Sequence, residues 1–457
     1  MRTKTRLLLP IILLCAVILG SLIGGLYWYD NNVDRSGWVE KDGVRFYRDF
    51  HADPVSGWLD LPEGRYYFQE GGIPTTGWLE QEGVTYYFDG AGVMATGWRE
   101  LEGKTYYFGG NGAMVEGWLW LEEGRYYLHD GVKATLWQDI DGQRYYFDEN
   151  GRMVSGFAQI EGSQYYFDKD GIMAQGLTEL EGGTYLFTQE GVLCTGWQDL
   201  EDGRYYFSAE GPRLSGWQEI EGQLYYLGES GKMETGWLTL GENRYYLFED
   251  GHAAIGPNEI DGQLHHFSPK GIEVILVNAL HPIPSYYTMD IKNVVGYHDV
   301  DARCYDALVR MLADCEAAGI KYTFNSAYRT IKEQTEILEI RTQEHMEEFD
   351  LTFEEARKMA LDTVALPGTS EHNMGLAVDL LGKEAIAWFQ EHCWDYGFIL
   401  RYTAEKEPIT GITDEPWHFR YVGKDVALDM KDSGLCLEEY LGAEAVGNVA
   451  EDTLLGN

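Results

Sequence analysis

A Gly-Trp dipeptide, or a close variant of it, returns every 20 residues between positions 37 and 257 of this 457-residue chain. The interval shortens to 19 residues once, between Gly117 and Leu136. The units begin at Gly37, Gly57, Gly77, Gly97, Gly117, Leu136, Gly156, Gly176, Gly196, Gly216, Gly236 and Gly256. A period near 20 residues predicts an array of small units that must stack, because none can form a core alone.

Each unit has the same internal order: Gly-Trp, a short run, an acidic-Gly turn and then Tyr-Tyr-Phe. Glu102-Gly103, for example, precedes Tyr106-Tyr107-Phe108. Aromatic-rich runs on either side of a glycine turn are typical of a β-hairpin. Because a lone hairpin is marginal in water, we expect the hairpins to bury their aromatic faces against one another in an all-β solenoid.

This pattern resembles the choline-binding or cell-wall-binding repeats of Gram-positive surface proteins, over residues 36–273. The resemblance implies aromatic cages that hold choline on teichoic acid through cation–π contacts. Binding of another wall glycan, or a spacer whose aromatic rings serve only as core, stays open. Three units depart from the pattern, with Phe157, Leu177 and Pro257 in place of tryptophan. The ligand-cage candidates are Trp58, Trp78, Trp98, Trp118, Trp197, Trp217 and Trp237.

Charge and cysteine content exclude several classes. Asp and Glu outnumber Lys and Arg by 75 to 35, a net charge of −40, with no basic stripe. Nucleic acid would repel such a surface, so we expect no nucleic-acid partner. The six cysteines lie far apart without a Cys-x-x-Cys pair, which argues against a disulfide framework and a cysteine-rich zinc site.

The N-terminus is predicted to be a membrane anchor over residues 1–30. Arg2, Lys4 and Arg6 precede an apolar run from Leu7 to Trp28. This run reaches the roughly 20 residues that span a bilayer and exceeds the roughly 7–15-residue core of a signal peptide. With the basic flank in the cytoplasm, we expect the remaining chain to be extracytoplasmic. The resemblance of the repeats implies that it lies at the surface of a Gram-positive-type bacterium. Cleavage of this segment and secretion is the alternative.

After Gly271 the 20-residue period stops and helical spacing appears. Helices interspersed with short strands predict a small α+β domain over residues 274–441, followed by an acidic tail over 442–457. The expected helices are Asp301–Ala318, Thr330–Arg341, Thr352–Ala360 and Glu384–Tyr396, and the expected strands are Tyr322–Asn325, Leu376–Leu380 and His418–Val422.

Two runs of this domain, 367–379 and 410–418, supply two imidazoles and a carboxylate at His372, Asp379 and His418. Three protein ligands with a fourth position for water is how catalytic zinc is held. One continuous helix would separate His372 from Asp379 by about 10 Å, so we expect a turn at Gly375 that feeds a strand. Pro416 can interrupt strand alternation and let Glu415 reach the metal site.

These runs, with Ser326-Ala-Tyr-Arg329 upstream, resemble the zinc D-alanyl-D-alanine carboxypeptidases of the vancomycin-resistance type, across residues 274–442. The resemblance implies that the three candidate ligands bind Zn²⁺ and that Glu415 is the general base. It implies that Arg329 polarises the scissile carbonyl and stabilises the oxyanion. Ser370 would hold the terminal carboxylate of the peptide, and Gln334 is a further substrate-binding candidate.

Together these features predict a membrane-anchored zinc metallopeptidase that removes the terminal D-Ala from peptidoglycan stem peptides and is held at the wall by its repeats. A penicillin-binding serine peptidase would need Ser-x-x-Lys, and a helical zinc protease would need His-Glu-x-x-His; the sequence holds neither. A D,D-dipeptidase or an endopeptidase of the same fold remains an alternative, as does a non-catalytic wall-binding scaffold or adhesin.

Overall fold

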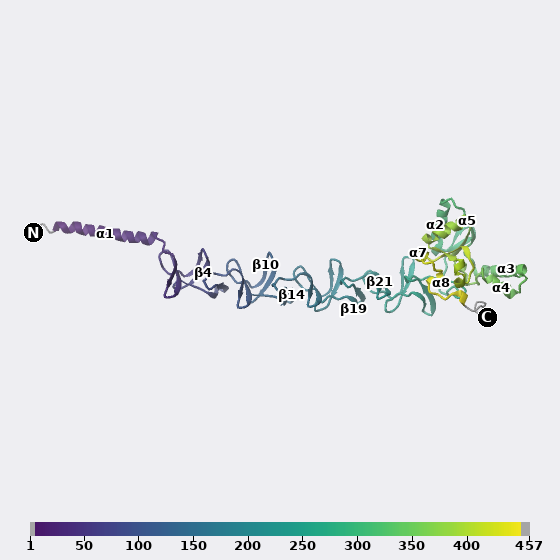
Figure 1. The fold of residues 1–457 in the computed structure, drawn as a ribbon, viewed down its shortest axis with the longest axis horizontal. Coiled ribbons are helices and arrows are strands. Elements are labelled where there is room, and N and C mark those ends of the chain that lie inside the picture. The colour runs from purple at the N-terminus through teal and green to yellow at the C-terminus, as the bar shows by residue number, and fades with distance from the viewer. Residues whose placement is uncertain (1–4, 449–457) are drawn as a thin grey trace. The chain divides into compact units, whose positions relative to one another are not determined.

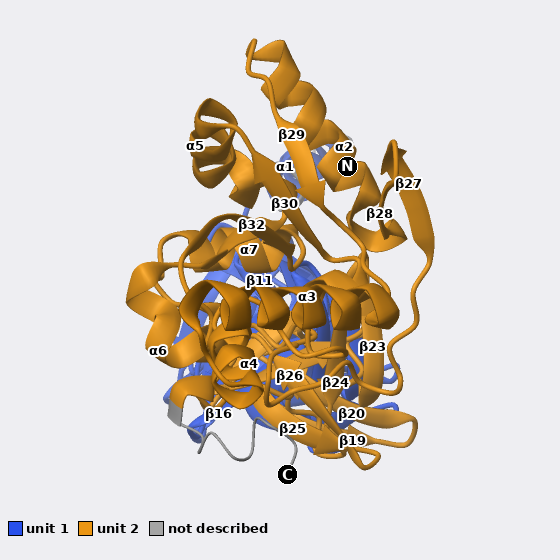
Figure 2. Cartoon of the chain, turned by 90° about the vertical axis from the view of Figure 1, so that its right-hand side faces the viewer, with its two compact units in different colours: residues 1–194 blue, residues 195–457 orange. Residues whose placement is uncertain are grey.

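The computed structural model describes residues 5–448 of the chain, and side chains from residue 12 onward except those of residues 30–32. Two compact units divide after Cys194 (Figure 2). The second unit contains the last four hairpins of the array together with the C-terminal domain. Arg2, Lys4 and the end of the acidic tail from residue 449 lie outside the described residues.

The chain begins with helix α1 (Thr5–Asn32), which is the apolar helix expected at the N-terminus. Its stretch Ile12–Tyr29 has a mean hydropathy of 2.0 and exposed side chains. By length and composition this helix can cross a membrane, and it equally meets the criteria for a signal sequence. Its role as an anchor therefore stays a prediction.

Each repeat unit forms one antiparallel hairpin (Figure 1). Short strands β5 (Ile73–Pro74) and β12 (Val132–Lys133) are added beside two of them. The hairpins are β1–β2 (Gly37–Lys41, Val44–Arg48), β3–β4 (Gly57–Leu61, Gly64–Gln69), β6–β7 (Gly77–Gln81, Val84–Phe88), β8–β9 (Gly97–Leu101, Lys104–Phe108), β10–β11 (Gly117–Leu121, Gly124–His129), β13–β14 (Leu136–Ile140, Gln143–Phe147), β15–β16 (Gly156–Ile160, Ser163–Phe167), β17–β18 (Gly176–Leu180, Gly183–Phe187), β19–β20 (Gly196–Leu200, Gly203–Phe207), β21–β22 (Gly216–Ile220, Gln223–Leu227), β23–β24 (Gly236–Leu240, Asn243–Leu247) and β25–β26 (Gly256–Ile260, Gln263–Phe267).

The acidic-Gly turns close these hairpins as the sequence predicts. Glu102 and Gly103 both have positive φ, 53° and 77°, which is the geometry that matches strand twist in a two-residue hairpin turn. The last aromatic of the second strand is fully buried, as at Phe88 and Phe108. Backbone hydrogen bonds join successive units, for example from Met94 N–H to Arg65 C=O at 2.8 Å. The hairpins thus stabilise one another, as the period requires.

The C-terminal domain is built on a four-stranded antiparallel sheet with the order β29-β30-β32-β31. Its strands are β29 (Thr323–Ser326), β30 (Ala377–Leu381), β32 (Glu415–Tyr421) and β31 (Phe398–Tyr402). A separate hairpin, β27–β28 (Ile291–Val295 and His298–Asp301), precedes the first helix of the domain. The sequence predicted three of the four sheet strands and missed β31.

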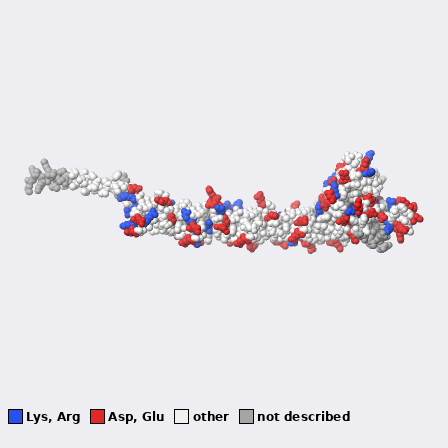
Figure 3. Space-filling view, in the orientation of Figure 1, with Lys and Arg blue, Asp and Glu red and all other residues white. Residues whose placement is uncertain are grey.

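Helices α2 and α5 pack their apolar residues on this sheet, where Leu308 and Phe389 join Phe419 in one fully buried core. Helices α3 and α4 form a pair whose acidic surface is visible in Figure 3. The last hairpins of the array also share a core with this domain, which brings Tyr245 together with Leu437. The helices are α2 (Ala302–Ala317), α3 (Ile331–Phe349), α4 (Phe353–Leu361), α5 (Lys383–His392), α6 (Glu407–Thr410), α7 (Lys424–Lys431) and α8 (Leu437–Tyr440).

The turn expected at Gly375 has little room. Gly375 has φ +67°, and a Cβ at this position would lie 2.8 Å from the backbone nitrogen of Asp301. We expect Gly375→Ala to lower the free energy of unfolding of the C-terminal domain by roughly 2–5 kcal/mol, which combines left-handed strain with overpacking. The shift of its urea-unfolding midpoint measures this loss.

Gly434→Ala is the matched control, because Gly434 has φ +68° and open space around its Cβ position. The free energy of unfolding of this variant should fall by only about 1–2 kcal/mol, which is the cost of a left-handed φ at alanine. Equal losses in the two variants would contradict the close packing of the turn.

Candidate active site

The pairing of β30 with β32 sets the centre of the candidate site. Asp379 of β30 lies directly opposite His418 of β32, and Ser326 of β29 pairs with Asp379 on its other side. His372 comes from a short 3-10 helix, η1 (Glu371–Met374), which ends at Gly375 immediately before β30. The predicted turn at Gly375 is therefore confirmed, and it brings His372 to Asp379, whereas His418 arrives through the strand pairing.

The side chains of these three residues converge in a buried cluster. One ligand atom from each of His372, Asp379 and His418 lies within 4.8 Å of the other two. His372 Nε2 is 3.3 Å from Asp379 Oδ2, and His418 Nδ1 is 3.1 Å from Asp379 Oδ1. Glu415 Oε2 lies 3.3 Å from His418 Nδ1, so the carboxylate of Glu415 reaches the same cluster.

The outward-facing nitrogen of each imidazole has a fixed partner. His372 Nδ1 donates to the carbonyl oxygen of Ala327 at 2.7 Å. His418 Nε2 lies 3.2 Å from Glu371 Oε2, to which it donates. These bonds leave His372 Nε2 and His418 Nδ1 directed at Asp379, in the arrangement typical of metal-binding histidines.

Electrostatics in the cluster favour a cation. Burial lowers the pKa of His372, which favours the neutral imidazole that a metal needs. Burial alone would also lower the pKa of His418, but its contacts with Asp379, Glu371 and Glu415 hold that pKa well above its usual value. His418 thus lies among three carboxylates, which favour a positive charge at its position.

These residues fit a zinc ion. Two imidazoles and one carboxylate are a known donor set for catalytic zinc, which keeps its fourth position open. A tetrahedral ion with bonds of about 2.0–2.1 Å holds its ligand atoms roughly 3.3 Å apart, close to the spacing of the two histidine nitrogens from Asp379. His372, Asp379 and His418 would hold the ion.

Arg329 lies beside this cluster and is held from three sides. Its Nη2 is 3.0 Å from Asp379 Oδ2, and its Nε donates to Ser326 Oγ at 2.6 Å. Its Nη1 donates to Gln334 Oε1 at 3.2 Å, while Gln334 Nε2 donates to the carbonyl oxygen of Ala365. Gln334 is only 1% exposed, so the structure places it behind Arg329 rather than on an open surface.

A hollow of about 260 Å³ lies next to the cluster. Thr369 and Tyr402 line it, with Ala365 and Ile412 on its walls. Tyr402 borders the metal ligands, because its ring centroid is 4.9 Å from that of His418. Ser370, which is 5% exposed, follows Thr369 directly. None of the three candidate ligands lines this hollow, and it meets the cluster through Tyr402.

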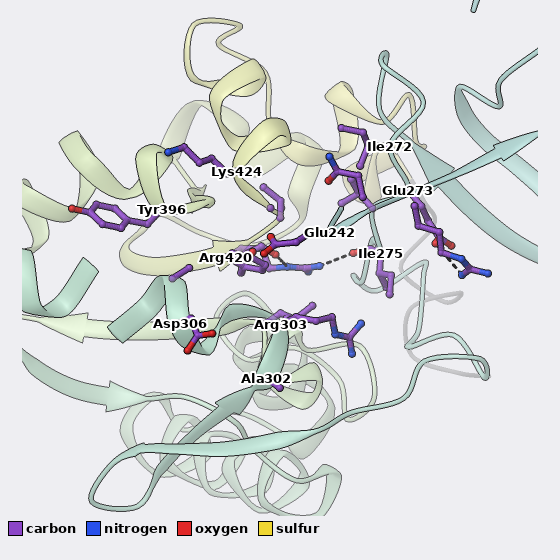
Figure 4. Close-up of a pocket in the computed structure, with 18 of the residues that line it drawn as sticks. Glu242, Ile272, Glu273, Ile275, Ala302, Arg303, Asp306, Tyr396, Arg420 and Lys424 are labelled. Carbon is purple, nitrogen blue, oxygen red and sulfur yellow. Dashed lines mark hydrogen bonds and ion pairs between the residues drawn. The ribbon is translucent and has the colours of Figure 1, made fainter. Parts of the chain in front are cut away.

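A larger cavity of about 710 Å³ lies in the same unit, lined by residues of the β24 hairpin, of the segment after the array and of α2 (Figure 4). Charges of both signs line it, including Glu242, Arg303 and Lys424. Arg420 reaches its wall and donates to the carbonyl oxygen of Ile275 at 2.7 Å. None of the three candidate ligands lines this cavity either.

Sequence reasoning missed a buried ion network behind His418. Glu371 Oε1 accepts from Arg401 at 2.7 Å and from Arg420 at 3.0 Å. Arg401 also forms a two-point pair with Glu438, at 2.6 and 2.9 Å. Burial would raise the pKa of Glu371, but the two arginines hold it well below its usual value. Charged residues inside otherwise apolar strands, as at Arg401 and Arg420, are the signal that could have revealed the network.

The tryptophan candidates of the array occupy equivalent positions. Each packs against the paired tyrosine of its own hairpin and against a ring of the next hairpin. Trp58, for example, lies 5.2 Å from Tyr67 and 4.9 Å from Tyr86 between ring centroids. The same pattern holds for Trp78, Trp98, Trp118, Trp197, Trp217 and Trp237, where His265 replaces the second tyrosine of Trp237.

Comparison with known proteins decides the family of the C-terminal domain. A family model described as D-alanyl-D-alanine carboxypeptidase matches residues 297–424. A D-alanyl-D-alanine carboxypeptidase of Enterococcus faecalis is 38% identical over 178 residues, which cover 37% of this chain and 66% of the relative. A bifunctional D-Ala-D-Ala dipeptidase and carboxypeptidase of Enterococcus gallinarum is 33% identical, over 36% of this chain and 91% of the relative.

The chain belongs to the D-alanyl-D-alanine carboxypeptidase family. This confirms the family and the enzyme class predicted from the sequence. A solved vancomycin resistance D,D-pentapeptidase in complex with Zn(II) is 38% identical over 36% of this chain and 97% of its own, with a TM-score of 0.35. That protein was solved with zinc bound.

The array matches repeat families as well. A choline-binding repeat model matches residues 95–133 and 214–256, and a putative cell wall binding repeat model matches residues 76–94, 137–153 and 155–173. Choline binding protein F of Streptococcus pneumoniae, solved with a peptidoglycan analogue, is 26% identical over 53% of this chain and all of its own, with a TM-score of 0.39. The repeats are those of an extracytoplasmic, cell-surface protein.

The hydrogen bond from His418 to Glu371 generates a prediction for this carboxypeptidase. We expect Glu371→Gln to weaken zinc binding by about 10–100-fold, because the carboxylate that orients the ligand is lost. Competition with a chromophoric chelator measures the affinity.

Glu438→Gln is the matched control, since Glu438 belongs to the same buried network without touching His418. Both variants should be less stable than the wild type, but only Glu371→Gln should show the weakening of zinc binding by about 10–100-fold. Unchanged zinc affinity in a folded Glu371→Gln protein would contradict this role.

Proposed function

We propose that this protein is a wall-attached zinc carboxypeptidase that removes the terminal D-Ala from peptidoglycan stem peptides. The observation that carries the proposal is the convergence of His372 Nε2, His418 Nδ1 and Asp379 in one buried cluster, with Glu415 3.3 Å from His418 and Arg329 3.0 Å from Asp379. This is one metal site, one base and one fixed positive charge within reach of the same reacting atoms.

Zinc bound by the three ligands would lower the pKa of a water molecule and polarise the scissile carbonyl. Glu415 would act as the general base that accepts a proton from the attacking water and would then donate a proton to the leaving D-Ala amine. Arg329 stabilises the negative charge that develops on the carbonyl oxygen, because a guanidinium stays charged at every relevant pH. Gln334 and Ser326 hold Arg329 in place by the hydrogen bonds described above.

The hollow beside Tyr402 is the proposed site for the peptide. Ser370 stands at its edge next to Thr369 and is assigned to the terminal carboxylate of the substrate. The walls formed by Leu366 and Ile412 are apolar, which suits the methyl groups of D-Ala.

Attachment to the wall is assigned to the array. Its hairpins stack as the units of a solenoid, and their aromatic rings bind choline-decorated teichoic acid or another wall glycan. Helix α1 is assigned to the membrane as an anchor, and the domains follow the limits 1–30, 36–273, 274–441 and 442–457. The anchor and the array place the peptidase where polymeric stem peptides are abundant, which favours the carboxypeptidase over a dipeptidase that acts on free D-Ala-D-Ala. An endopeptidase and a non-catalytic scaffold are the remaining outcomes of the test.

The test is D-Ala release from a peptide that ends in L-Lys-D-Ala-D-Ala, by the full chain in detergent. Release should stop on removal of zinc by a chelator and should be insensitive to penicillin. Glu415→Gln should lower kcat by about 10²–10⁴-fold with zinc content unchanged, because only the proton transfer is lost.

Glu405→Gln, at an exposed position of the same domain, is the control and should retain full activity. Faster hydrolysis of free D-Ala-D-Ala than of the peptide would favour the dipeptidase, and cleavage elsewhere in the stem would favour the endopeptidase. No hydrolysis by a folded, zinc-loaded chain would overturn the proposal in favour of a scaffold.

A further inference from the structure

Arginine side chains of the chain itself cover the tryptophan rings of several repeat units. A guanidinium lies within cation–π distance of the ring centroid in each of them. The pairs are Arg45 on Trp38 at 3.8 Å, Arg65 on Trp58 at 4.9 Å, Arg144 on Trp137 at 4.9 Å, Arg204 on Trp197 at 4.7 Å and Arg244 on Trp237 at 3.6 Å. In every pair the arginine follows its tryptophan by seven residues.

Strand register explains this position. In the hairpin of Trp58, Asp60 pairs directly with Arg65, and both side chains share the face that carries Trp58. Arg65 Nε lies 3.5 Å from Asp60 Oδ1 while its guanidinium covers the ring. Arg204 repeats this geometry with Asp199. The carboxylate and the ring together form a site for a cation, and the arginine occupies it.

The unit of Trp78 retains the site but lacks the arginine. Thr85 stands at the arginine position and pairs with Glu80, as Arg65 pairs with Asp60. Trp78 contacts its tyrosines at 5.1 and 5.0 Å, nearly as Trp58 does. It is nevertheless 45% exposed, more than any other Gly-Trp tryptophan in the described chain. An aromatic face and a carboxylate thus remain open together at this unit.

The other units without such an arginine contact are closed in different ways. Lys133 lies 5.4 Å from the ring of Trp98. Trp118 is accompanied by Trp120 at 6.2 Å, while Arg125 of that hairpin turns to Asp170. In the unit of Trp217 the arginine position holds Leu224, and Trp217 packs on the core that the last hairpins share with the C-terminal domain. The unit of Trp98 also carries a threonine and a carboxylate, Thr105 and Glu100, but Trp98 has the lysine contact and is less exposed. Trp78 is therefore distinguished by its exposure.

We propose that the arginines are built-in occupants of the cation sites of the array, and that the Trp78–Glu80 unit is the one left open for an external quaternary ammonium group. The residue seven positions after the tryptophan then decides between the units of Trp58 and Trp78, where it is Arg65 in one and Thr85 in the other. A guanidinium over the ring excludes a second cation by both volume and charge. This inference rests on the proposed attachment of the array to choline-bearing wall polymer.

The experiment is ¹⁹F NMR of the full chain labelled with 5-fluorotryptophan, in neutral maltoside micelles and titrated with choline. The resonances of Trp58 and Trp78 are assigned through Trp58→Phe and Trp78→Phe. In the wild-type protein the Trp78 signal should shift with choline and the Trp58 signal should not. An uncharged analogue, 3,3-dimethyl-1-butanol, should bind roughly tenfold more weakly, because the cation–π attraction is lost.

Matched substitutions exchange the residues that lie seven positions after Trp58 and Trp78. Thr85→Arg should abolish the response of Trp78, whereas Thr85→Val should preserve it. Arg65→Thr should make Trp58 responsive. A Trp78 response that persists in Thr85→Arg, or equal responses of Trp58 and Trp78 in the wild type, would overturn the inference.

If no tryptophan responds in any of these proteins, choline attachment by the array fails as well as the inference. D-Ala release is measured on the same samples and reports on the proposed catalytic function separately.

Discussion

Antiparallel pairing of β30 with β32 places Asp379 directly opposite His418, and the rest of the candidate metal cluster is arranged around this pair. A slip of one residue would turn one of the two side chains to the opposite face of the sheet. The chain enters β30 from Gly375, so the same pairing determines where His372 arrives. A site whose ligands come from two strands and a turn thus depends on a single register.

The ion network behind His418 stabilises that register from the inner side. Glu371, Glu438, Arg401 and Arg420 are all buried and carry two negative and two positive charges. Such a network adds little stability over an apolar core, but loss of one member leaves an uncompensated charge, at about 3–5 kcal/mol. Because Glu371 also accepts from His418, the network fixes the orientation of a metal ligand as well as the fold.

Much of this organisation could be predicted from the sequence. The repeat period and the acidic-Gly turns predicted the hairpins, and helical spacing predicted α2 and α4 to within a residue or two at each end. Helix α3 extends to Phe349. The predicted helix ended at Arg341, because the residues of the added turns are polar and show only a weak helical period. Strand β31 was missed, although Gly397 caps the preceding 3-10 helix directly before it. The partners of Glu371 could not be foreseen, because they lie 30 and 49 positions away along the chain and meet only in the folded sheet.

In the array, too, the sequence identifies the units, whereas the contacts of their side chains depend on the fold. The Gly-Trp period identifies candidate rings, but only the folded hairpins show that arginine covers Trp58 while Trp78 is exposed. The signal was present in the sequence as the residue seven positions after each tryptophan. Only the strand register of the hairpin shows that this residue lies over the tryptophan ring.

The central claim is most directly tested by anomalous diffraction at the zinc absorption edge, on crystals of the zinc-loaded protein. The account predicts one strong peak about 2.0–2.2 Å from His372 Nε2, His418 Nδ1 and a carboxylate oxygen of Asp379, with Glu415 next to the open position. A zinc ion bound elsewhere, or bound through His418 Nε2 with the bond to Glu371 broken, would contradict it.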